Sequence, residues 1–529
     1  MIDSLEIIIL LFELVFFAVI SIIIAEMFAK VSMNYVSLIM GAVLGLLPVT
    51  TYDIRSFNPE VFMLLIVAPL LFFEGQSTFL NVVGKRVKQI FQVTVIMVLL
   101  CAIVAGFSSY AIGKIGLPLA FILAAISTPT DATATQSVTE GLKIPRREGF
   151  FLKMESLFND ASGIILLNMA VLWYINGRIN YRETLTDFIL SAGGGIVIGF
   201  IIAWIIVLFR QALLRSSYNS VNAQVIIYLM TPFIIYYLAE EFHVSGIIAV
   251  VCAGLVHNAE TQRSRLANAQ MVYMGTNLVS IITELFNSIV FVILGMMLVN
   301  IIKDESITYN SWIWITLGTI LYLSNVIVRY IYGRIKFKMD NHAGWIFSLG
   351  GVHGAVTLSL AFTVAKTSVN SQDFSLIVMS ESVLIILSMI VPTVIFRFIL
   401  DKDVSDEDGE KELDELREEM IQQAIATVQK MYLAKNVKQS VIFDLKSQNQ
   451  NTRTRDFVKE WRNAVRHPQY TEAEKEMERR AFINAFYQER QYLDMISQKE
   501  ARYEKYVYHL YSEILLVESI VLNSEFVEE

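Results

Sequence analysis

Two carboxylates, an amide and a hydroxyl crowd the stretch ESLFNDASG, residues 155–163. In a helix, Ser156 and Asp160 are four residues apart and share one face, while Glu155 and Asn159 share the adjoining face. This polar arc suits a desolvated monovalent cation, which needs several oxygen ligands and one or two negative charges. It also suits a proton, because neighbouring carboxylates disfavour each other's ionisation. The spacing therefore indicates a site at which protons and cations compete.

Three further ionisable residues lie in apolar sequence. Glu74 ends LLFFEG, Asp131 lies in STPTDATATQS, and Arg329 lies in LSNVIVRYIYG. A charge at the centre of a bilayer costs at least about 2.5–3.5 kcal/mol. Such residues therefore mark a functional site. The alternative, that they only hold helices together, fits a single Asn or Ser better than it fits two Asp and two Glu residues. For Arg329 we expect a carboxylate partner, because an unpaired buried guanidinium is the costlier state.

A helix breaker lies beside Asp131. Pro129 removes a backbone hydrogen bond and disfavours helix at Thr128, and the nearby threonines can bond local backbone instead. Irregular backbone at membrane depth is tolerated only where protein or water satisfies it. We therefore expect an unwound segment whose freed carbonyls face an ion, with Thr130 and Asp131 turned toward Asp160 on the next span.

The composition is that of a polytopic membrane protein. Of the 529 residues, 55% are hydrophobic and 17% are charged, against about 25% charged in soluble domains. The two cysteines, Cys101 and Cys252, both lie in apolar runs and imply neither a disulfide framework nor a metal cluster. The start of the chain, MIDSLE, is acidic, which is not typical of a cleaved signal peptide.

We expect 13 membrane spans, since a helix needs roughly 20 apolar residues to cross, and fewer where protein shields its ends. They run near residues 5–25, 35–48, 60–74, 90–113, 118–140, 150–175, 186–210, 223–239, 244–257, 274–300, 312–336, 344–366 and 374–400. Alternate connections carry 16 and 6 Lys or Arg residues. Because cytoplasmic loops are enriched in these residues, the N-terminus is expected outside the plasma membrane and the C-terminus inside.

An inverted repeat would pair spans 1–6 with spans 8–13 and so match the fifth span to the twelfth. The twelfth reads IFSLGGVHGAVTLSLAF, in which His353 lies at a break made by Gly350, Gly351 and Gly354. We therefore expect two broken helices in corresponding positions of the two halves.

Taken together, these motifs resemble those of a monovalent cation/proton antiporter, in the electroneutral sodium/proton exchanger branch (NhaP-like, cation–proton antiporter family 1). The resemblance covers roughly residues 5–400 and is strongest in ESLFNDASG, since this branch has Asn-Asp where the electrogenic branch has Asp-Asp. PTDATA, LLFFEG and GGVHGAVTLSLA also match in order. The resemblance implies an all-α, NhaA-like antiporter fold with two broken, crossing helices. It also implies a homodimer in which a core domain rocks against a dimer domain.

The resemblance also implies roles for individual residues. Five would bind Na⁺ and H⁺: Asp160 and Asp131, the expected Na⁺ ligands, with Thr130, Ser156 and Glu74. Two would form a structural ion pair: Glu155 and Arg329. Four would support the crossing region: Asn159, Pro129, Gly351 and Gly354. No cofactor is expected besides the transported cation and proton, and the expected partners are membrane lipid and a second copy of the chain, not nucleic acid.

Two positions depart from the family pattern. Ala132 stands where the family has Pro, although Pro129 is kept, so the unwound segment could be shorter. His353 stands where the family usually has Arg. Because His can lose its charge near physiological pH, we hypothesise that it makes activity more pH-dependent. The alternative is a neutral His that only fills space.

Charge divides the chain into a transmembrane domain, residues 1–400, and a helical cytosolic tail, residues 401–529. The tail carries 27 acidic and 19 basic residues, whereas the rest is balanced. It starts with an acidic linker, and Thr471 and Glu474 have the spacing of a capping box before a helical stretch to about Val527. No Gly-rich nucleotide fingerprint is present. The tail therefore either aids dimerisation or regulates transport through a ligand or partner that the sequence does not identify.

Other functions stay open at this point. A K⁺-preferring antiporter would use the same scaffold, whereas a cation channel or Na⁺-coupled symporter would not need protonation of Asp160 for turnover. An intramembrane aspartyl protease also needs two buried Asp residues, but the Gly-x-Gly-Asp element of that class is absent. We therefore expect a transporter and not an enzyme.

Overall fold

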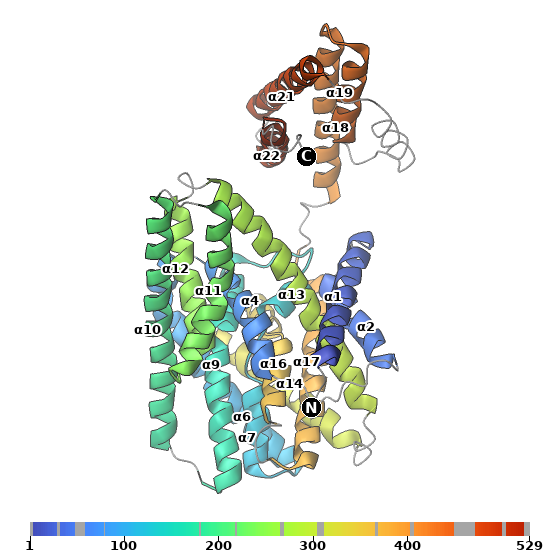
Figure 1. Ribbon diagram of the computed structural model, residues 1–529. Coiled ribbons are helices and arrows are strands. Elements are labelled where there is room, and N and C mark those ends of the chain that lie inside the picture. Colours follow the sequence, from blue (N-terminus) through green and yellow to red (C-terminus); the bar gives the residue numbers. More distant parts are fainter. Residues whose placement is uncertain are drawn as a thin grey trace. The chain divides into compact units, whose positions relative to one another are not determined.

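The computed structural model describes twelve stretches of the chain (Figure 1): residues 4–28, 32–47, 59–78, 80–178, 181–216, 220–264, 269–303, 311–364, 369–401, 407–448, 471–499 and 504–522. Within these stretches every regular element is a helix, which confirms the predicted all-α class. The chain forms two compact units, Met1–Lys402 and Asp403–Glu529.

Each predicted span coincides with a helix or with a short series of helices. Nine are single helices: α1 (Ser4–Met27), α2 (Met33–Leu46), α9 (Arg146–Asn176), α10 (Tyr181–Leu214), α11 (Val221–Glu241), α12 (Gly246–Ser264), α13 (Ala269–Lys303), α14 (Ser311–Lys336) and α17 (Ser371–Ile399). Four are interrupted: α3–η2–α4 (Pro59–Phe62, Met63–Val67, Ala68–Gln76), α5–η3–α6 (Leu80–Phe91, Gln92–Met97, Val98–Gly113), α7–α8 (Leu117–Ile126, Ala132–Val138) and α15–α16 (Asn341–Leu349, Ala355–Thr363).

Several of these helices are long and apolar enough to cross a membrane. Among the described residues, six helices qualify by length and composition, and a bent pair within α9 makes a seventh if it is one span. The most apolar window of α10 is only 17% buried, so most of its apolar side chains face outward, as expected for a helix in contact with lipid. The total of 13 crossings stays a prediction, because the shorter helices would cross only with protein shielding their ends.

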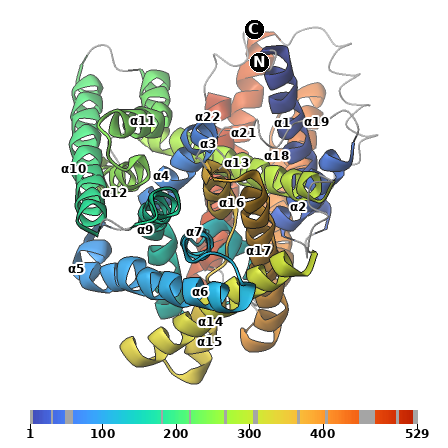
Figure 2. The same cartoon turned by 90° about the horizontal axis from the view of Figure 1, so that it is seen from below.

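The interrupted helix α7 lies near the centre of the membrane unit. In Figure 2, α7, α9 and α16 are seen close together, with α10, α11 and α12 packed to one side. Helices α1, α2 and α13 pack against one another on the other side. Helices α7, α9 and α16 therefore lie between these two groups of helices.

The two interrupted helices α7–α8 and α15–α16 meet at their unwound segments, which together form the crossing region. The Asp131 backbone N–H donates to the Val352 carbonyl at 2.7 Å, and the Pro129 carbonyl accepts from Nδ1 of His353 at 2.7 Å. Each break therefore satisfies backbone groups of the other, as a membrane interior requires. The structure differs here from the expectation that freed carbonyls face an ion, because the Pro129 carbonyl is directed to the other broken helix.

Local side chains set where the break begins and ends. The hydroxyls of Ser127 and Thr128 donate to the carbonyls one turn earlier, at 2.9 and 2.8 Å, and so close the end of α7. Asp131 caps α8, since its Oδ1 accepts from the backbone N–H groups of residues 133 and 134. Ala132 is the first residue of α8, a position that Pro also favours. The break thus spans residues 127–131 with Ala in the place of Pro.

The C-terminal unit is a helical bundle with its own core. Helices α18 (Glu407–Lys430), α19 (Lys435–Ser447), α21 (Glu472–Lys499) and α22 (Glu504–Leu522) share one hydrophobic cluster. The predicted capping box is confirmed, because the Glu474 N–H donates to Oγ1 of Thr471 at 3.4 Å and the Thr471 N–H donates to Oε2 of Glu474 at 3.0 Å. The end of the predicted helical stretch, beyond Leu522, lies outside the described residues.

Glu489 of α21 is the exception in this apolar core. Its side chain is fully buried, and neither carboxylate oxygen has a well-aligned hydrogen bond to the residues that the structure describes. Burial raises the pKa of Glu489 to about 8, and the neighbouring Gln448 amide and Arg490 guanidinium only partly oppose the shift. The folded unit therefore favours the protonated, neutral side chain.

The raised pKa makes the stability of this unit depend on pH. The folded unit holds the proton up to about pH 8, whereas the unfolded chain releases it near the ordinary value of 4.5. The free energy of unfolding should therefore fall by up to about 1.4 kcal/mol per pH unit between these values and level off above them. Glu489→Gln should remove this slope and protect the unit at alkaline pH. Hydrogen–deuterium exchange of α21 peptides in the full chain, corrected for intrinsic exchange, measures the effect.

Glu476→Gln is the matched control, because Glu476 lies at the surface of the same helix and pairs with Arg480. It should leave the pH slope as in the unmodified chain. An identical slope for the unmodified chain and Glu489→Gln would contradict the assignment of the slope to Glu489.

Candidate ion-binding site

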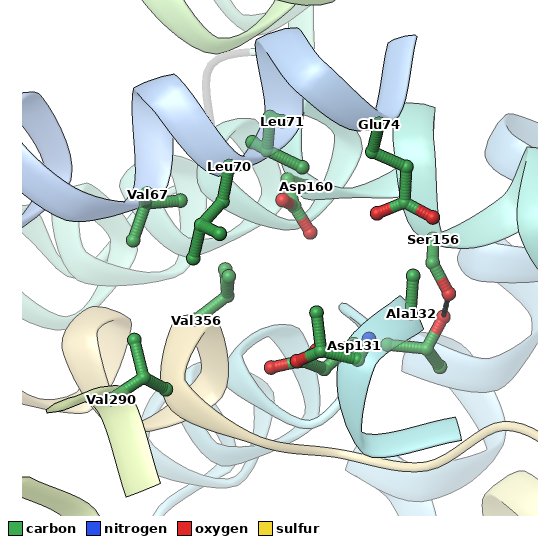
Figure 3. A pocket seen from close by; sticks show the side chains of 12 residues that line it. Val67, Leu70, Leu71, Glu74, Asp131, Ala132, Ser156, Asp160, Val290 and Val356 are labelled. Atoms are coloured by element: carbon green, nitrogen blue, oxygen red, sulfur yellow. Dashed lines mark hydrogen bonds between the residues drawn. The ribbon is translucent and has the colours of Figure 1, made fainter. Parts of the chain in front are cut away.

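A small cavity of about 40 Å³ lies in the membrane unit beside the crossing region (Figure 3). One water molecule needs roughly 10–15 Å³ by the same measure, so the cavity has room for an ion with little water around it. Its lining combines carboxylates, hydroxyls and apolar side chains: Val67, Leu70, Leu71, Glu74, Thr130, Asp131, Ala132, Thr133, Ser156, Asp160, Val290 and Val356.

All five residues predicted to bind the cation and proton line this cavity. Asp160 and Ser156 come from α9, Glu74 comes from α4, and Thr130 and Asp131 come from the break between α7 and α8. Figure 3 shows Glu74, Asp131, Ser156 and Asp160 around one space, with Val290 of α13 and Val356 of α16 also bordering it. Three separate segments of the chain therefore bring oxygen atoms to one place.

Asp160 is the carboxylate of this cavity whose negative charge is least compensated. Its side chain is 1% exposed, and neither carboxylate oxygen has a hydrogen-bond partner among the described residues. The nearby carboxylates of Asp131 and Glu74 add electrostatic repulsion to an ionised Asp160. A buried, unpaired carboxylate is strongly disfavoured. The geometry therefore fits a site that holds either a proton or a cation.

Hydroxyl groups of two helices are arranged next to the carboxylates. The hydroxyl oxygens of Thr130 and Ser156 are 3.0 Å apart and share a hydrogen bond. The Asn159 amide donates to Oγ1 of Thr130 at 2.9 Å. Asn159 thus fixes the unwound segment against α9 and orients the Thr130 oxygen.

Asp131 lines the cavity and also caps the start of α8. Its Oδ1 caps α8 and also accepts from the Thr133 hydroxyl at 2.7 Å. Its Oδ2 lies against Gly354, where an added Cβ would come within 2.4 Å of that oxygen. Gly354 therefore leaves the space that the Asp131 carboxylate occupies.

Glu155 points away from the cavity and pairs with Arg329 of α14. Arg329 also donates to the carbonyls of Phe347 at 2.8 Å and Ser348 at 3.2 Å, which ties α14 to the end of α15. The ion pair that the resemblance implied between Glu155 and Arg329 is therefore present in the structure. Of the four polar residues in the predicted arc of α9, Ser156 and Asp160 line the cavity.

His353 is buried in the crossing region. Its Nδ1 donates to the Pro129 carbonyl, and its backbone N–H donates to the Ser388 hydroxyl at 3.0 Å. A neutral imidazole with its proton on Nδ1 can make this contact. The position of the ring is therefore compatible with both sequence-based hypotheses about His353.

Sequence reasoning missed two residues that hold the break in place. A Cβ on Gly163 would come within 2.5 Å of the Pro129 ring, so α9 passes directly against the unwound segment. The Asn325 amide donates to the Ser127 carbonyl at 2.8 Å and satisfies a group that the break frees. Both residues lie in motifs quoted above. The sequence feature that could have identified them is a glycine or an amide side chain inside an apolar span.

Comparison with known proteins gives consistent matches to cation/proton antiporters. A family model described as "Sodium/hydrogen exchanger, transmembrane" matches residues 14–402. A "Sodium, potassium, lithium and rubidium/H(+) antiporter" of Bacillus pumilus (strain SAFR-032) is 33% identical over 368 residues, 66% of this chain and 54% of that protein. A protein of the same name from Bacillus subtilis (strain 168) is 28% identical over 392 residues, 70% of this chain and 58% of that protein. The chain thus spans little more than half the length of these two relatives.

The fold also matches a solved structure. The sodium proton antiporter MjNhaP1 from Methanocaldococcus jannaschii superposes with a TM-score of 0.60 at 18% sequence identity. The match covers 74% of this chain and 98% of that chain. At this identity the likeness concerns the fold, and it agrees with the predicted antiporter architecture.

The contact between Gly351 and Arg329 gives a testable consequence. A Cβ on Gly351 would come within 2.2 Å of the Arg329 guanidinium carbon, so Gly351→Ala should displace the buried ion pair and destabilise the membrane unit by about 1–3 kcal/mol. Gly193→Ala in α10 is the control, because nothing lies within 4 Å of its added Cβ. Thermal unfolding of both variants in detergent measures the difference, and equal midpoints would contradict the close contact.

Proposed function

The chain belongs to the sodium/hydrogen exchanger family, and on that premise we propose that it is a secondary active transporter that exchanges Na⁺ for H⁺. The family match confirms the resemblance to NhaP-type cation/proton antiporters that the motifs indicated, and it identifies a multi-pass membrane protein. The relatives that it matches carry the names of transporters and not of enzymes.

The state of Asp160 is the observation that carries the proposal. Among the described residues neither of its oxygens has a hydrogen-bond partner, and the cavity around it also contains Asp131 and Glu74. One positive charge, from a proton or a cation, offsets its charge, and the small cavity disfavours both at once. Competition for one carboxylate converts a gradient of one ion into movement of the other. We propose that Thr130 and Ser156 supply further oxygens and that Glu74 completes or gates the site.

We propose one-for-one, electroneutral exchange. Asn159 stands beside Asp160 where a second carboxylate would add a negative charge, and its amide is engaged by Thr130. Glu155 is already neutralised by Arg329. Of the two carboxylates in ESLFNDASG, Asp160 is therefore the one available to carry one proton or one monovalent cation.

Cations other than Na⁺ are also candidates for transport. The two Bacillus relatives are named for sodium, potassium, lithium and rubidium, which supports exchange of K⁺ or Li⁺ as well as Na⁺. A cation channel or a Na⁺-coupled symporter has no comparable support from the relatives' names.

The same proposal includes the oligomeric state, the membrane and the orientation of the protein. We propose alternating access in a homodimer, in a bacterial plasma membrane, with the N-terminus outside and the C-terminal unit in the cytoplasm. We expect lipid as the other partner, no nucleic acid and no cofactor besides the transported ions. For the C-terminal unit we propose a role either in dimerisation or in regulation of transport.

Proteoliposomes with an acidic interior and a pH-sensitive dye test the exchange. External Na⁺, Li⁺ or K⁺ should drive protons out through the unmodified protein, at a rate that an imposed voltage does not change. Asp160→Asn should reduce this movement to the background, because a neutral amide cannot exchange a proton for a cation. Asp340→Asn serves as the control, since Asp340 is an exposed cap of α15.

Strong dependence on voltage would contradict one-for-one exchange. Exchange that persists in Asp160→Asn would contradict the site. Cation flux that needs no proton gradient and moves no protons would favour a channel.

His353→Arg tests the pH hypothesis for the crossing region. If the histidine makes activity more pH-dependent, the Arg variant should exchange ions over a broader pH range. The initial rates of both proteins across a pH series give the two profiles, and superimposable profiles would show that His353 only fills space.

A further inference from the structure

Glu381 is a buried carboxylate of the membrane unit that the proposed exchange does not use. It lies in α17, its side chain has no exposed surface, and neither oxygen has a hydrogen-bond partner among the described residues. It does not line the cavity around Asp160. Its local sequence, SESVLIIL, gives a single polar triplet at the edge of an apolar run.

The helices around α17 enclose Glu381 tightly. A Cβ on Gly318 of α14 would come within 2.4 Å of the Ser380 carbonyl and 2.6 Å of Cβ of Val383. The two helices are therefore in contact on both sides of Glu381 in the sequence. Helices α7, α8, α13, α15 and α16 also pack against α17. These contacts leave the Glu381 side chain without solvent-exposed surface in the conformation described.

No positive group compensates Glu381 within the described part of the unit. Helices α7, α8 and α16 contain no charged residue. On α14, Arg329 is committed to Glu155, while Arg334 and Lys336 lie in the last turn. The remaining groups on these elements that can carry a positive charge are His342 of α15, His353 in the crossing region, Lys303 of α13 and Arg397 in the last turn of α17. Among the described residues none of them is a partner of Glu381.

We propose that Glu381 is a second proton-binding site of the membrane unit and holds its proton in this conformation. An isolated ionised carboxylate in such surroundings is disfavoured by far more than a neutral carboxylic acid. The site takes a proton and not a metal cation, because among the described residues no group of three or more His, Cys, Asp or Glu side chains that could hold a metal ion is present. The proposal goes beyond cation exchange and does not depend on Asp160.

The position of Glu381 connects this proton to the crossing region. Ser388, seven residues further along α17 and so on the same face, accepts the backbone N–H of His353. A movement of α17 relative to the broken helices would therefore alter both the crossing region and the enclosure of Glu381. Release of the proton is then expected only in a conformation that admits water to this part of α17.

Infrared spectroscopy of the full chain in lipid tests the proposal directly. A protonated carboxylic acid has a C=O stretching band that is separate from that of a carboxylate, and ¹³C-labelling of glutamate distinguishes Glu from Asp. In an Asp160→Asn background at neutral pH, Glu381→Gln should remove one glutamic-acid band. Glu381→Asp should move the corresponding band out of the glutamate-labelled set, and it provides a second variant if the amide disturbs folding.

Asp373→Asn is the matched control on the same helix, because Asp373 accepts a hydrogen bond from the Tyr174 hydroxyl at 2.6 Å. It should leave the glutamic-acid bands unchanged. If neither Glu381 variant removes a band at neutral pH, Glu381 is ionised and the proposal is wrong. Because the Asp160→Asn background already lacks the proposed exchange site, failure of the exchange mechanism would not alter this result.

Discussion

Backbone groups inside a membrane must find partners within the protein, and in this chain two broken helices supply those partners to each other. The Pro129 carbonyl is satisfied by His353, and the Asp131 N–H is satisfied by Val352. Neither break would be tolerated at this depth alone. Because the two breaks hold each other, Asp131 and Thr130 can be presented at a fixed place beside α9. The position of every other site residue is defined relative to that contact.

The same constraint explains how charge is distributed around the site. Glu155 and Arg329 neutralise each other, and Arg329 uses its other donors on the end of α15. Asp131 is partly satisfied by capping α8. Asp160 has no such partner among the described residues. The fold therefore leaves one carboxylate of the cavity with an uncompensated negative charge, and exchange of a proton for a cation requires such a group.

In the described part of the chain, three buried carboxylates have no well-aligned hydrogen bond, and their surroundings differ. Asp160 faces a cavity with other oxygen atoms, Glu381 is enclosed by apolar helices, and Glu489 lies in the core of the C-terminal unit. Burial disfavours the charged form at all three. What differs is whether a cation can replace the proton, and only the Asp160 cavity offers several oxygens and the space for an ion.

The sequence alone determined the chemistry of the site, because a polar residue inside an apolar span is conspicuous wherever it occurs. ESLFNDASG, Asp131 and Glu74 were found in this way, and the interruption at Pro129 followed from the covalent structure of proline. Only the tertiary structure decided which of these residues share a cavity. It turned Glu155 away from Asp160, directed the Pro129 carbonyl to His353, and required glycine at residues 163 and 354. These outcomes depend on contacts between helices far apart in the chain, and the periodicity of a single helix carries no information about what its neighbours present to it.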